Sequence, residues 1–358
     1  MKTLFISLSD LNDYTGGSMC SRRNYECLCQ VVGDENVDVV ILRPYTERNS
    51  YFFNMIWNKT TFHSIAEYNV EYAKYDLLFI DSCLISSSLK EIRKGGFKGK
   101  VIVFFHNCEY DFQYFVRPSA TVSGKIVKAI FMRAIKYQES YALKKADVCM
   151  FLNERDLKRE GELYHIKPQA SLVLPMSIGD KFDESISIKE SNTSEKPLYT
   201  LLGSFFPPNV EGAKWFVENV LPYVDIRFQI IGKDMHKLKD LFDCSGVEIY
   251  SNVPDLKPYL LNTDYMLFPI FDGSGMKVKT CEALMYGKNI VGTPEAFSGY
   301  MIDDYTKVGA CCSSASEFIN AINSLDMPRY NSHNRNHYKE HFSYESSIKV
   351  LKNCIENL

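Results

Sequence analysis

The feature that most constrains the fold is a repeated alternation of short strand-like segments with longer helical ones. The short segments are rich in β-branched and aromatic residues, and each is followed by a polar or amphipathic stretch. A strand that connects through a helix to the next strand gives a parallel sheet with helical crossovers, so the sequence predicts an α/β fold. The segments stand at residues 3–8, 37–42, 76–81, 100–106, 147–152, 170–175, 198–203, 226–232, 246–251, 264–269 and 288–293.

The chain is too long for one such sheet, and its composition marks a place to divide it. Its 358 residues exceed the size that one hydrophobic core usually organises. Residues 183–197 are polar, charged and closed by a proline, as a surface linker would be. We therefore predict an N-terminal domain over 1–182, a linker over 183–197 and a C-terminal domain over 198–342. A C-terminal helix over 343–358 is expected to pack back on the first domain.

Composition and charge narrow the class of protein. Hydrophobic residues at 46% and charged residues at 24% are typical of a folded globular chain. The net charge of -3 gives no general reason to expect nucleic acid. Eleven cysteines without a C-x-x-C pair indicate reduced thiols in a cytoplasmic protein. The first residues are too short an apolar run for a signal peptide, and no segment approaches the ~20 apolar residues that span a bilayer.

Residues 268–293, FPIFDGSGMKVKTCEALMYGKNIVGT, carry the pattern of an anion site. Two glycines flank a serine at 273–275, between a predicted strand and a helix expected to begin near Met276. A helix start offers unpaired N–H groups and a partial positive charge, and glycine lets a ligand approach the backbone. Lys279 and Glu282 share one helix face, where they would suit a diphosphate and a ribose diol. The alternative is a glycine turn before an ordinary helix with a surface ion pair.

This stretch resembles the donor-binding signature of the GT-B glycosyltransferases, in particular the retaining group classed as family 4. Further similar blocks follow in the family's order at 16–18, 105–115, 142–156, 201–222, 228–234 and 251–269. The resemblance implies two Rossmann-like parallel-sheet domains that face each other across a cleft. It also implies transfer of a sugar from a nucleotide-diphosphate sugar to a saccharide or lipid-linked saccharide, with retention, in cell-surface polysaccharide or glycan synthesis.

The resemblance assigns donor-binding residues, with two departures from the family's pattern. Ser274 stands where many members have a glutamate that contacts the sugar, and Ser204 stands where a cation is frequent. Lys279 is therefore expected to be the main phosphate cation, with Lys277 and Lys233 in reserve. Family frequency gives a mild preference for UDP. The implied donor-binding residues are Gly17, Gly203, Ser204, Asn252, Val253, Gly273, Ser274, Gly275, Met276, Lys277, Lys279 and Glu282, with backbone contacts to the base from Asn252 and Val253.

The other predicted catalytic residue besides Lys279 is His106, at the end of the strand-like segment 100–106. A lone histidine is usually a structural residue, but the resemblance implies that His106 lies beside the transferred sugar. Gly16, Asn107 and Glu109 are then candidates on the acceptor side. The residues alone leave open a tight turn at 16–17 and an ordinary ion pair for Glu109. For Asn209, the sequence favours a structural role as an N-cap.

A basic amphipathic helix is predicted near 124–145. Cations interleave with apolar residues, which gives one basic and one apolar face. Such a helix can lie on an anionic membrane surface, or it can pack on its own domain with a solvated basic side. A lipid-linked acceptor would favour the first alternative. The protein would then be peripheral on the inner face of the membrane.

No metal cluster is apparent, because no paired Asp-x-Asp follows a strand in the donor half. We therefore expect transfer without a metal, and no cofactor apart from the donor substrate. The expected partners are a nucleotide sugar and a glycan or lipid-linked glycan acceptor, and no nucleic acid. Two alternatives remain: a nucleotide-sugar epimerase or hydrolase of the same fold, and a catalytically silent glycosyltransferase-like subunit.

Overall fold

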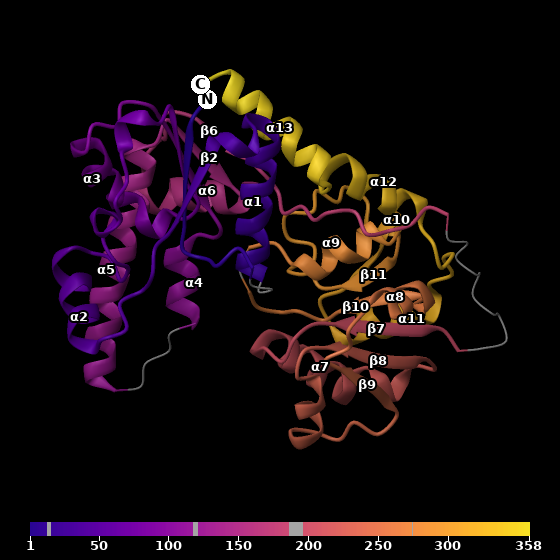
Figure 1. The fold of residues 1–358 in the computed structure, drawn as a ribbon. Coiled ribbons are helices and arrows are strands. Elements are labelled where there is room, and N and C mark those ends of the chain that lie inside the picture. The colour runs from indigo at the N-terminus through magenta and orange to yellow at the C-terminus, as the bar shows by residue number, and fades with distance from the viewer. Residues whose placement is uncertain (13–15, 117–120, 186–195, 274) are drawn as a thin grey trace. The chain divides into compact units, whose positions relative to one another are not determined.

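Two units, each built on its own parallel sheet, make up the fold (Figure 1). The structure is a computed structural model that describes residues 1–12, 16–116, 121–185, 196–273 and 275–358. Unit 1 comprises Met1–Pro175 with Ser347–Leu358, and unit 2 comprises Met176–Ser346. The predicted linker falls within unit 2, and its residues 186–195 lie outside the described residues.

The sheet of unit 1 has the strand order β2-β1-β3-β4-β5-β6, with every neighbouring pair parallel. Its central strands are buried on both faces, which explains why they read as continuous apolar runs. The strands are β1 (Thr3–Ser7), β2 (Val37–Ile41), β3 (Leu77–Ile80), β4 (Lys100–Phe105), β5 (Val148–Phe151) and β6 (Ser171–Val173).

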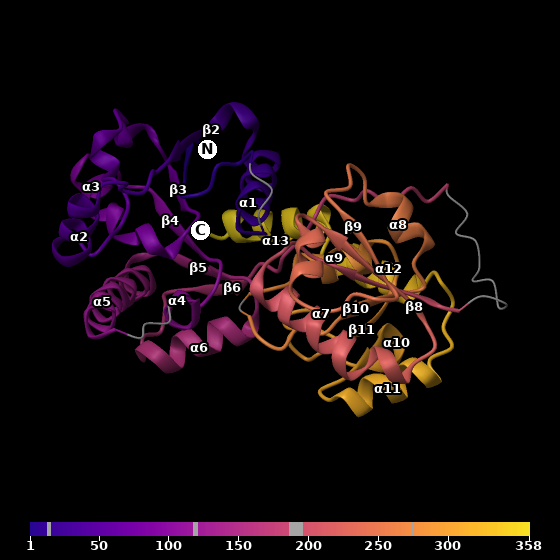
Figure 2. The same ribbon diagram turned by 90° about the horizontal axis from the view of Figure 1, so that it is seen from below.

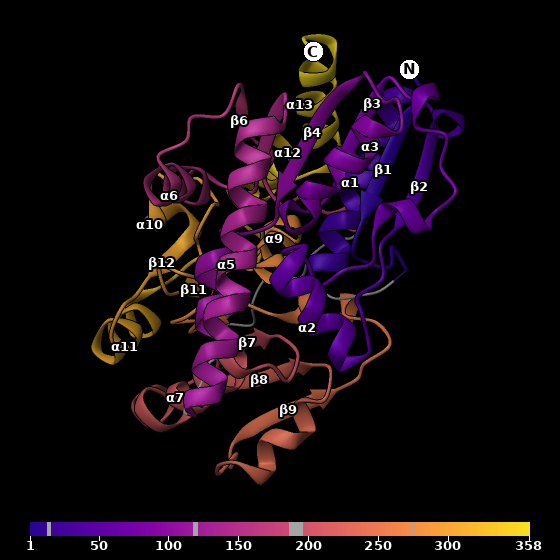
Figure 3. The same ribbon diagram turned by 90° about the vertical axis from the view of Figure 1, so that its left-hand side faces the viewer.

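Helices cover both faces of this sheet. On one face, Phe5 stacks on Phe79 and meets Tyr25 from α1. On the other face, Ala142 and Leu143 of α5 join the main apolar core. Helix α5 also packs along α2 (Figure 3) and along α4. The helices are α1 (Gly16–Val32), α2 (Arg48–Trp57), α3 (Leu89–Lys94), α4 (Glu109–Val116), α5 (Val122–Lys145) and α6 (Glu154–Tyr164).

The sheet of unit 2 has the order β12-β11-β10-β7-β8-β9, again parallel throughout. Strand β12 was not predicted, because it is short and carries none of the β-branched or aromatic residues that mark a strand. Its Gly309 is required, since a Cβ there would overlap the carbonyl oxygen of Ile290 on the neighbouring strand. The strands are β7 (Leu198–Leu202), β8 (Arg227–Gly232), β9 (Val247–Ser251), β10 (Tyr265–Phe268), β11 (Asn289–Gly292) and β12 (Gly309–Cys311).

Helices α7 and α11 cover one face of this sheet, where Phe216 and Phe318 lie in the core (Figure 2). Helix α9 packs against α12 and β11. Helix α13 starts in unit 2, and its residues from Ser347 onwards belong to unit 1. The helices are α7 (Pro207–Asn219), α8 (Lys257–Asn262), α9 (Val278–Met285), α10 (Tyr305–Val308), α11 (Ala315–Ser324), α12 (Ser332–His341) and α13 (Tyr344–Glu356).

The predicted α/β class and its two parallel sheets are confirmed. One boundary differs, because α9 begins at Val278 and not near Met276. Every one of the eleven cysteines is a free thiol. Among the helices of the described residues, none combines the length and apolar character that crossing a bilayer requires.

Candidate functional site

Two glycines bring the loops after β7 and β8 into contact at the carboxyl edge of the unit 2 sheet. A Cβ on Gly232 would overlap the carbonyl oxygen of Gly203. A Cβ on Gly203 would lie 2.8 Å from the Asn209 side-chain nitrogen and 3.1 Å from Lys279 Nζ. Only glycine at 203 therefore leaves the Lys279 ammonium group in place beside the backbone.

Lys279 is held by Asn209, which was predicted to cap a helix. Its ammonium group donates a short hydrogen bond to Asn209 Oδ1, and Asn209 Nδ2 donates to the Ser204 carbonyl at 2.8 Å. The prediction that Asn209 caps a helix is wrong. Helix α7 begins at Pro207, with Phe206 in the cap position, because proline is favoured in the first helical turn. Asn209 therefore lies inside the helix and connects Ser204 to Lys279.

Burial brings the pKa values of Lys279 and Glu282, which both lie on α9, close to 7. It lowers the pKa of Lys279 to about 7, a shift to which the charge of Lys277 adds and which Glu282 opposes. It also raises the pKa of Glu282 to about 7, against the opposing charges of Lys181 and Lys279. Both groups can therefore change protonation state when a charged ligand arrives.

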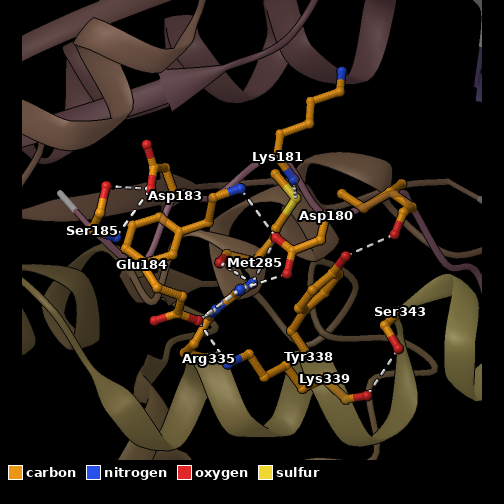
Figure 4. Close-up of polar contacts among 12 residues, drawn as sticks. Asp180, Lys181, Asp183, Glu184, Ser185, Met285, Arg335, Tyr338, Lys339 and Ser343 are labelled. Carbon is orange, nitrogen blue, oxygen red and sulfur yellow. Dashed lines mark hydrogen bonds and ion pairs between the residues drawn. The ribbon is translucent and has the colours of Figure 1, made fainter.

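Lys181 is a cation of this site that the sequence analysis missed. It lies on the segment 176–185, which Arg335 of α12 fixes against α9 (Figure 4). The Arg335 guanidinium donates to Asp180 at 2.9 and 2.5 Å, to Glu184 at 3.0 Å and to the Met285 carbonyl at 2.9 Å. No motif could have identified Lys181, since only the fold brings this segment to α9.

Lys277, expected as a reserve phosphate cation, forms an ion pair in the described structure. Its Nζ lies 2.6 Å from Glu295 Oε1 and donates to the Gly275 carbonyl at 3.2 Å. A Cβ on Gly273 would come within 3.1 Å of the same Nζ, and Gly275 has a positive φ of 64°. Lys277 and Glu295 therefore shape the glycine turn. Ser274, at the centre of that turn, lies outside the described residues.

The remaining donor-side residues take up distinct positions. Asn252 has a positive φ of 57°, its N–H donates to the Gly232 carbonyl at 3.2 Å, and its side chain accepts from the Asp234 N–H at 3.1 Å. The Asn252 N–H is therefore used within the turn, and the predicted base contact rests on its carbonyl and on half-buried Val253. Met276 is buried, where its sulfur accepts from the Met176 N–H at 3.3 Å.

In unit 1, the ends of β1, β3 and β4 surround His106. The His106 Nε2–H donates to the Asp81 carbonyl at 2.6 Å, and Nε2 lies 3.6 Å from the Asp81 carboxylate. Asp81 also accepts from Ser7 Oγ at 2.9 Å and from Asn24 Nδ2 at 2.6 Å. The imidazole remains 15% exposed, so one edge of the ring can meet a ligand.

The acceptor-side candidates lie on both sides of His106 along the chain. Gly16 starts α1, and a Cβ on Gly17 would meet nothing within 4 Å, so packing does not require glycine there. Asn107 donates to Glu109 Oε1 at 3.2 Å. Glu109 is 6% exposed and also accepts from Gln113 at 3.3 Å, and burial raises its pKa. The structure thus surrounds Glu109 with amides and gives it no arginine or lysine partner among the described contacts.

A buried acid cluster lies next to Glu109 and accepts a hydrogen bond from its N–H. Cys108, Glu139 and Glu160 bring their sulfur and carboxylate oxygens within 4.8 Å of one another. Glu139 already accepts from the N–H groups of Glu109 at 2.6 Å and Tyr110 at 3.2 Å and from a tyrosine hydroxyl. Burial, together with the charge of Glu139, raises the pKa of Glu160 to about 10. The two neighbouring carboxyl groups, of Glu139 and Glu160, are therefore suited to sharing one proton.

Replacing Glu160 with glutamine should therefore stabilise the protein increasingly as pH rises. Between pH 4.5 and about 10 the fold holds a proton that the unfolded chain releases, so the wild type loses stability through this window. Glu160→Gln removes that loss and should gain about 1 kcal/mol or more at pH 8, with little gain at pH 5. Thermal unfolding at both values measures the difference. The exposed Glu162→Gln on the same helix is the control, and an equal shift at both pH values would contradict the shared proton.

The sequence and the fold of this chain are similar to those of known proteins. Residues 196–326 match the family Glycosyl transferases group 1. No curated protein matches the chain in sequence. A sucrose-phosphate synthase from Thermosynechococcus elongatus is similar in structure, with a TM-score of 0.68 and 13% identity over 100% of this chain and 99% of that one.

Two further solved structures have the same fold. Anabaena HepE in complex with UDP gives a TM-score of 0.65 at 11% identity, with both chains covered to 100%. The lipopolysaccharide outer core galactosyltransferase WaaB gives 0.65 at 12% identity, over 100% of this chain and 99% of that one. These relatives confirm the predicted pair of Rossmann-like domains of the GT-B fold. Residues 196–326 therefore match the glycosyl transferases group 1 family, within a chain that has the GT-B fold.

Proposed function

We propose that the protein transfers a sugar from a nucleotide-diphosphate sugar to a saccharide or lipid-linked saccharide, with retention and without a metal, in cell-surface polysaccharide or glycan synthesis. The observation that carries the proposal is Lys279, held by Asn209 beside Gly203, with Glu282 on the same helix. HepE structures with UDP and with UDP-glucose support a nucleotide sugar as donor, and UDP is the first candidate. The site of action would be the cytoplasmic face of the membrane.

The chemistry that we propose is stabilisation of a leaving group. Negative charge grows on the diphosphate as the glycosidic bond breaks, and a fixed cation aimed at that charge lowers the barrier. Lys279 supplies this cation, while the Glu282 carboxylate accepts the ribose hydroxyls. His106 would lie beside the transferred sugar, with Asn107 and Glu109 towards the acceptor.

Two measurements test this proposal. Thermal shift with UDP, GDP and ADP should show stabilisation by one nucleoside diphosphate. Release of that diphosphate from the matching nucleotide sugar should require membrane extract as the source of acceptor. Release without extract would favour a hydrolase, conversion to another nucleotide sugar would favour an epimerase, and binding without any turnover would favour a silent subunit.

A basic groove in unit 1 supports the proposed contact with an anionic membrane. It has a volume of about 540 Å³ between α4 and α5. Lys128 Nζ lies 3.7 Å from the ring centre of Tyr114, and Lys136 Nζ lies 4.6 Å from that of Tyr110. Exposed apolar side chains occur on α5 and on α2, which packs along it. The groove is lined by Tyr110, Tyr114, Lys125, Lys128, Ala129, Met132, Arg133 and Lys136, and the exposed apolar residues are Phe53, Ile56, Trp57, Val122 and Ile126.

Reversing the charge of Lys125, Lys128 and Lys136 to glutamate should strongly weaken binding to anionic vesicles. Each cation near such a surface contributes about 1 kcal/mol, so the triple change should weaken binding at least about 100-fold at low salt. Vesicle sedimentation measures the loss, and nucleotide affinity should stay unchanged. Reversal of the exposed Lys214, Lys239 and Lys352 is the matched control. Vesicle binding that ignores both the groove mutations and salt would contradict the electrostatic contact.

A further inference from the structure

A fully buried arginine in unit 1 has no carboxylate partner among the described residues. Arg23 of α1 is 0% exposed, and its Nε and Nη1 have no hydrogen-bond partner within the described part of the chain. Its Nη2 contacts the sulfur of Cys20 at 3.5 Å, and its guanidinium lies 5.6 Å from the ring centre of Phe104. Burying a guanidinium without an anion is costly, so the group closest to it should carry negative charge.

Cys20 is that closest group, and it also faces His106. Cys20 is 2% exposed, its sulfur lies 3.5 Å from Arg23 Nη2, and it is close enough to His106 for the two side chains to act on each other electrostatically. His106 in turn contacts Asp81 through Nε2. The charged and titratable groups thus follow one another as arginine, thiol, imidazole and carboxylate. These are the titratable groups that act on Cys20 from α1 and from the ends of β3 and β4.

The order of these groups favours transfer of one proton. With the proton on sulfur, a neutral thiol and a neutral imidazole separate the charges of Arg23 and Asp81. If the S–H bond breaks and an N–H bond forms on the imidazole, each charge gains an opposite neighbour. The His106 Nε2 already donates to the Asp81 carbonyl, so Nδ1 is the nitrogen that receives the proton. No oxidant or other reactant is needed.

We propose that Cys20 is a buried thiolate that holds His106 as an imidazolium, with Arg23 and Asp81 fixing the two ends of the chain of charges. Cys20 is then a positioning residue, since it acts through His106. Titration supports this arrangement. Burial alone raises the pKa of Cys20, yet the charges of Arg23 and then His106 lower it below its ordinary value. Burial alone lowers the pKa of His106, yet Cys20 and Asp81 raise it well above the usual range.

The first test needs neither donor nor acceptor. The ultraviolet absorbance of the thiolate, taken as wild type minus Cys20→Ser, should show about one thiolate per chain at pH 7. Arg23→Met removes the cation beside Cys20, and Asp81→Asn removes the anion that stabilises the His106 imidazolium, so the band should appear only at higher pH in both. Asp81→Asn also removes the direct repulsion between Asp81 and the Cys20 sulfur, but this is the smallest of the effects on Cys20. Cys29→Ser is the control on the same helix, where burial raises the pKa of the thiol.

Absence of a thiolate band at pH 7 in the folded wild type would overturn the proposal, and so would a band that Arg23→Met and Asp81→Asn leave unchanged. Because Arg23 is buried, near-ultraviolet circular dichroism should first establish that each variant is folded. Asp81→Asn, which preserves the size of the side chain, gives the result if Arg23→Met is not folded. Either variant alone decides whether Arg23 and Asp81 set the pH at which the Cys20 thiol ionises.

The consequence for catalysis rests on the proposed function and is measured separately. Cys20→Ser should lower kcat about tenfold or more, with KM for the nucleotide sugar within about twofold, because His106 then loses its positive charge near its usual pKa. Activity of this variant should fall as pH rises through neutrality, where the wild type stays level. Cys20→Asp, which restores a fixed negative charge, should recover part of the rate. A wild-type pH profile in Cys20→Ser would contradict the catalytic role, while the thiolate band would remain a valid result.

Discussion

Replacing Lys279 with methionine is expected to lower the turnover of sugar transfer by about 100- to 1,000-fold, the range for loss of one fixed donor to a developing negative charge. The affinity for the ground-state nucleotide should fall much less, because the interaction is strongest when the leaving group carries full charge. Steady-state kinetics and a binding titration separate the two effects. A loss confined to affinity, with turnover at saturation intact, would contradict this role of Lys279.

The same substitution should stabilise the ligand-free protein, which distinguishes a catalytic lysine from a structural one. Burial lowers the pKa of Lys279 from 10.5 to about 7, so the unfolded chain binds the proton more tightly than the fold does. The lysine therefore costs stability near neutral pH, and this cost disappears as pH rises above 10.5. After loss of the Asn209 hydrogen bond, Lys279→Met should still gain about 1 to 2 kcal/mol at pH 7.

Lys288 provides the matched control within the same unit. Burial also lowers its pKa to about 7, but its ammonium group donates to three carbonyls, of Leu261, Thr263 and Arg329. Lys288→Met would also remove the cost of burying a charge, but it would leave three buried carbonyls without a donor, at roughly 1 to 3 kcal/mol each. Together these losses should outweigh the gain and destabilise the protein. Its turnover at a temperature where it is folded should match the wild type. Opposite signs of the stability change in the two variants are the expected result.

The sequence predicted the strands of both sheets because parallel strands buried on two faces leave continuous apolar runs. It missed β12, whose Gly309–Cys311 carries no such run and pairs only because glycine permits close approach to Ile290. It also misplaced Asn209, although the two prolines before it mark a helix that has already begun. Local signals thus identified the elements. The β12 error arose because a neighbouring strand decides that pairing, whereas the Asn209 error arose from a local proline signal that was given too little weight.

For the site, the sequence could identify Lys279 and Glu282, because their three-residue spacing on one helix is a local property. It could not identify Lys181 or Glu295, since their positions depend on contacts between distant segments. Nor could the sequence show that Asn209 connects Ser204 to Lys279. Contact of Lys279 and Glu282 with a nucleotide sugar is a prediction, and the pH dependence of affinity tests it.

The affinity for an intact nucleotide sugar should pass through a maximum near pH 7. Binding favours the charged ammonium of Lys279, whose pKa is about 7 in the free protein, so affinity should fall as pH rises above that value. Binding also favours the carboxylate form of Glu282, whose pKa is likewise about 7, so affinity should fall as pH drops below it. The limb below neutrality should approach a tenfold change per pH unit, whereas the limb above neutrality should be shallower, because Lys279 acts mainly on the transition state. The diphosphate of a nucleotide sugar has both ends esterified, so the ligand itself does not titrate there as a terminal phosphate would.

Two substitutions assign the limbs of this curve to their residues. Glu282→Gln should weaken binding by about 2 to 3 kcal/mol at pH 7, as loss of hydrogen bonds to a charged group does, and should abolish the limb below neutrality. Lys279→Met should abolish the limb above neutrality and leave the other. Calorimetric titration in buffers of different ionisation enthalpy should show proton uptake above pH 7 and release below it. If the folded Glu282→Gln variant retains the acidic limb and wild-type affinity, the ribose is held by another group, and the arrangement of Lys279 and Glu282 on α9 does not define the donor site.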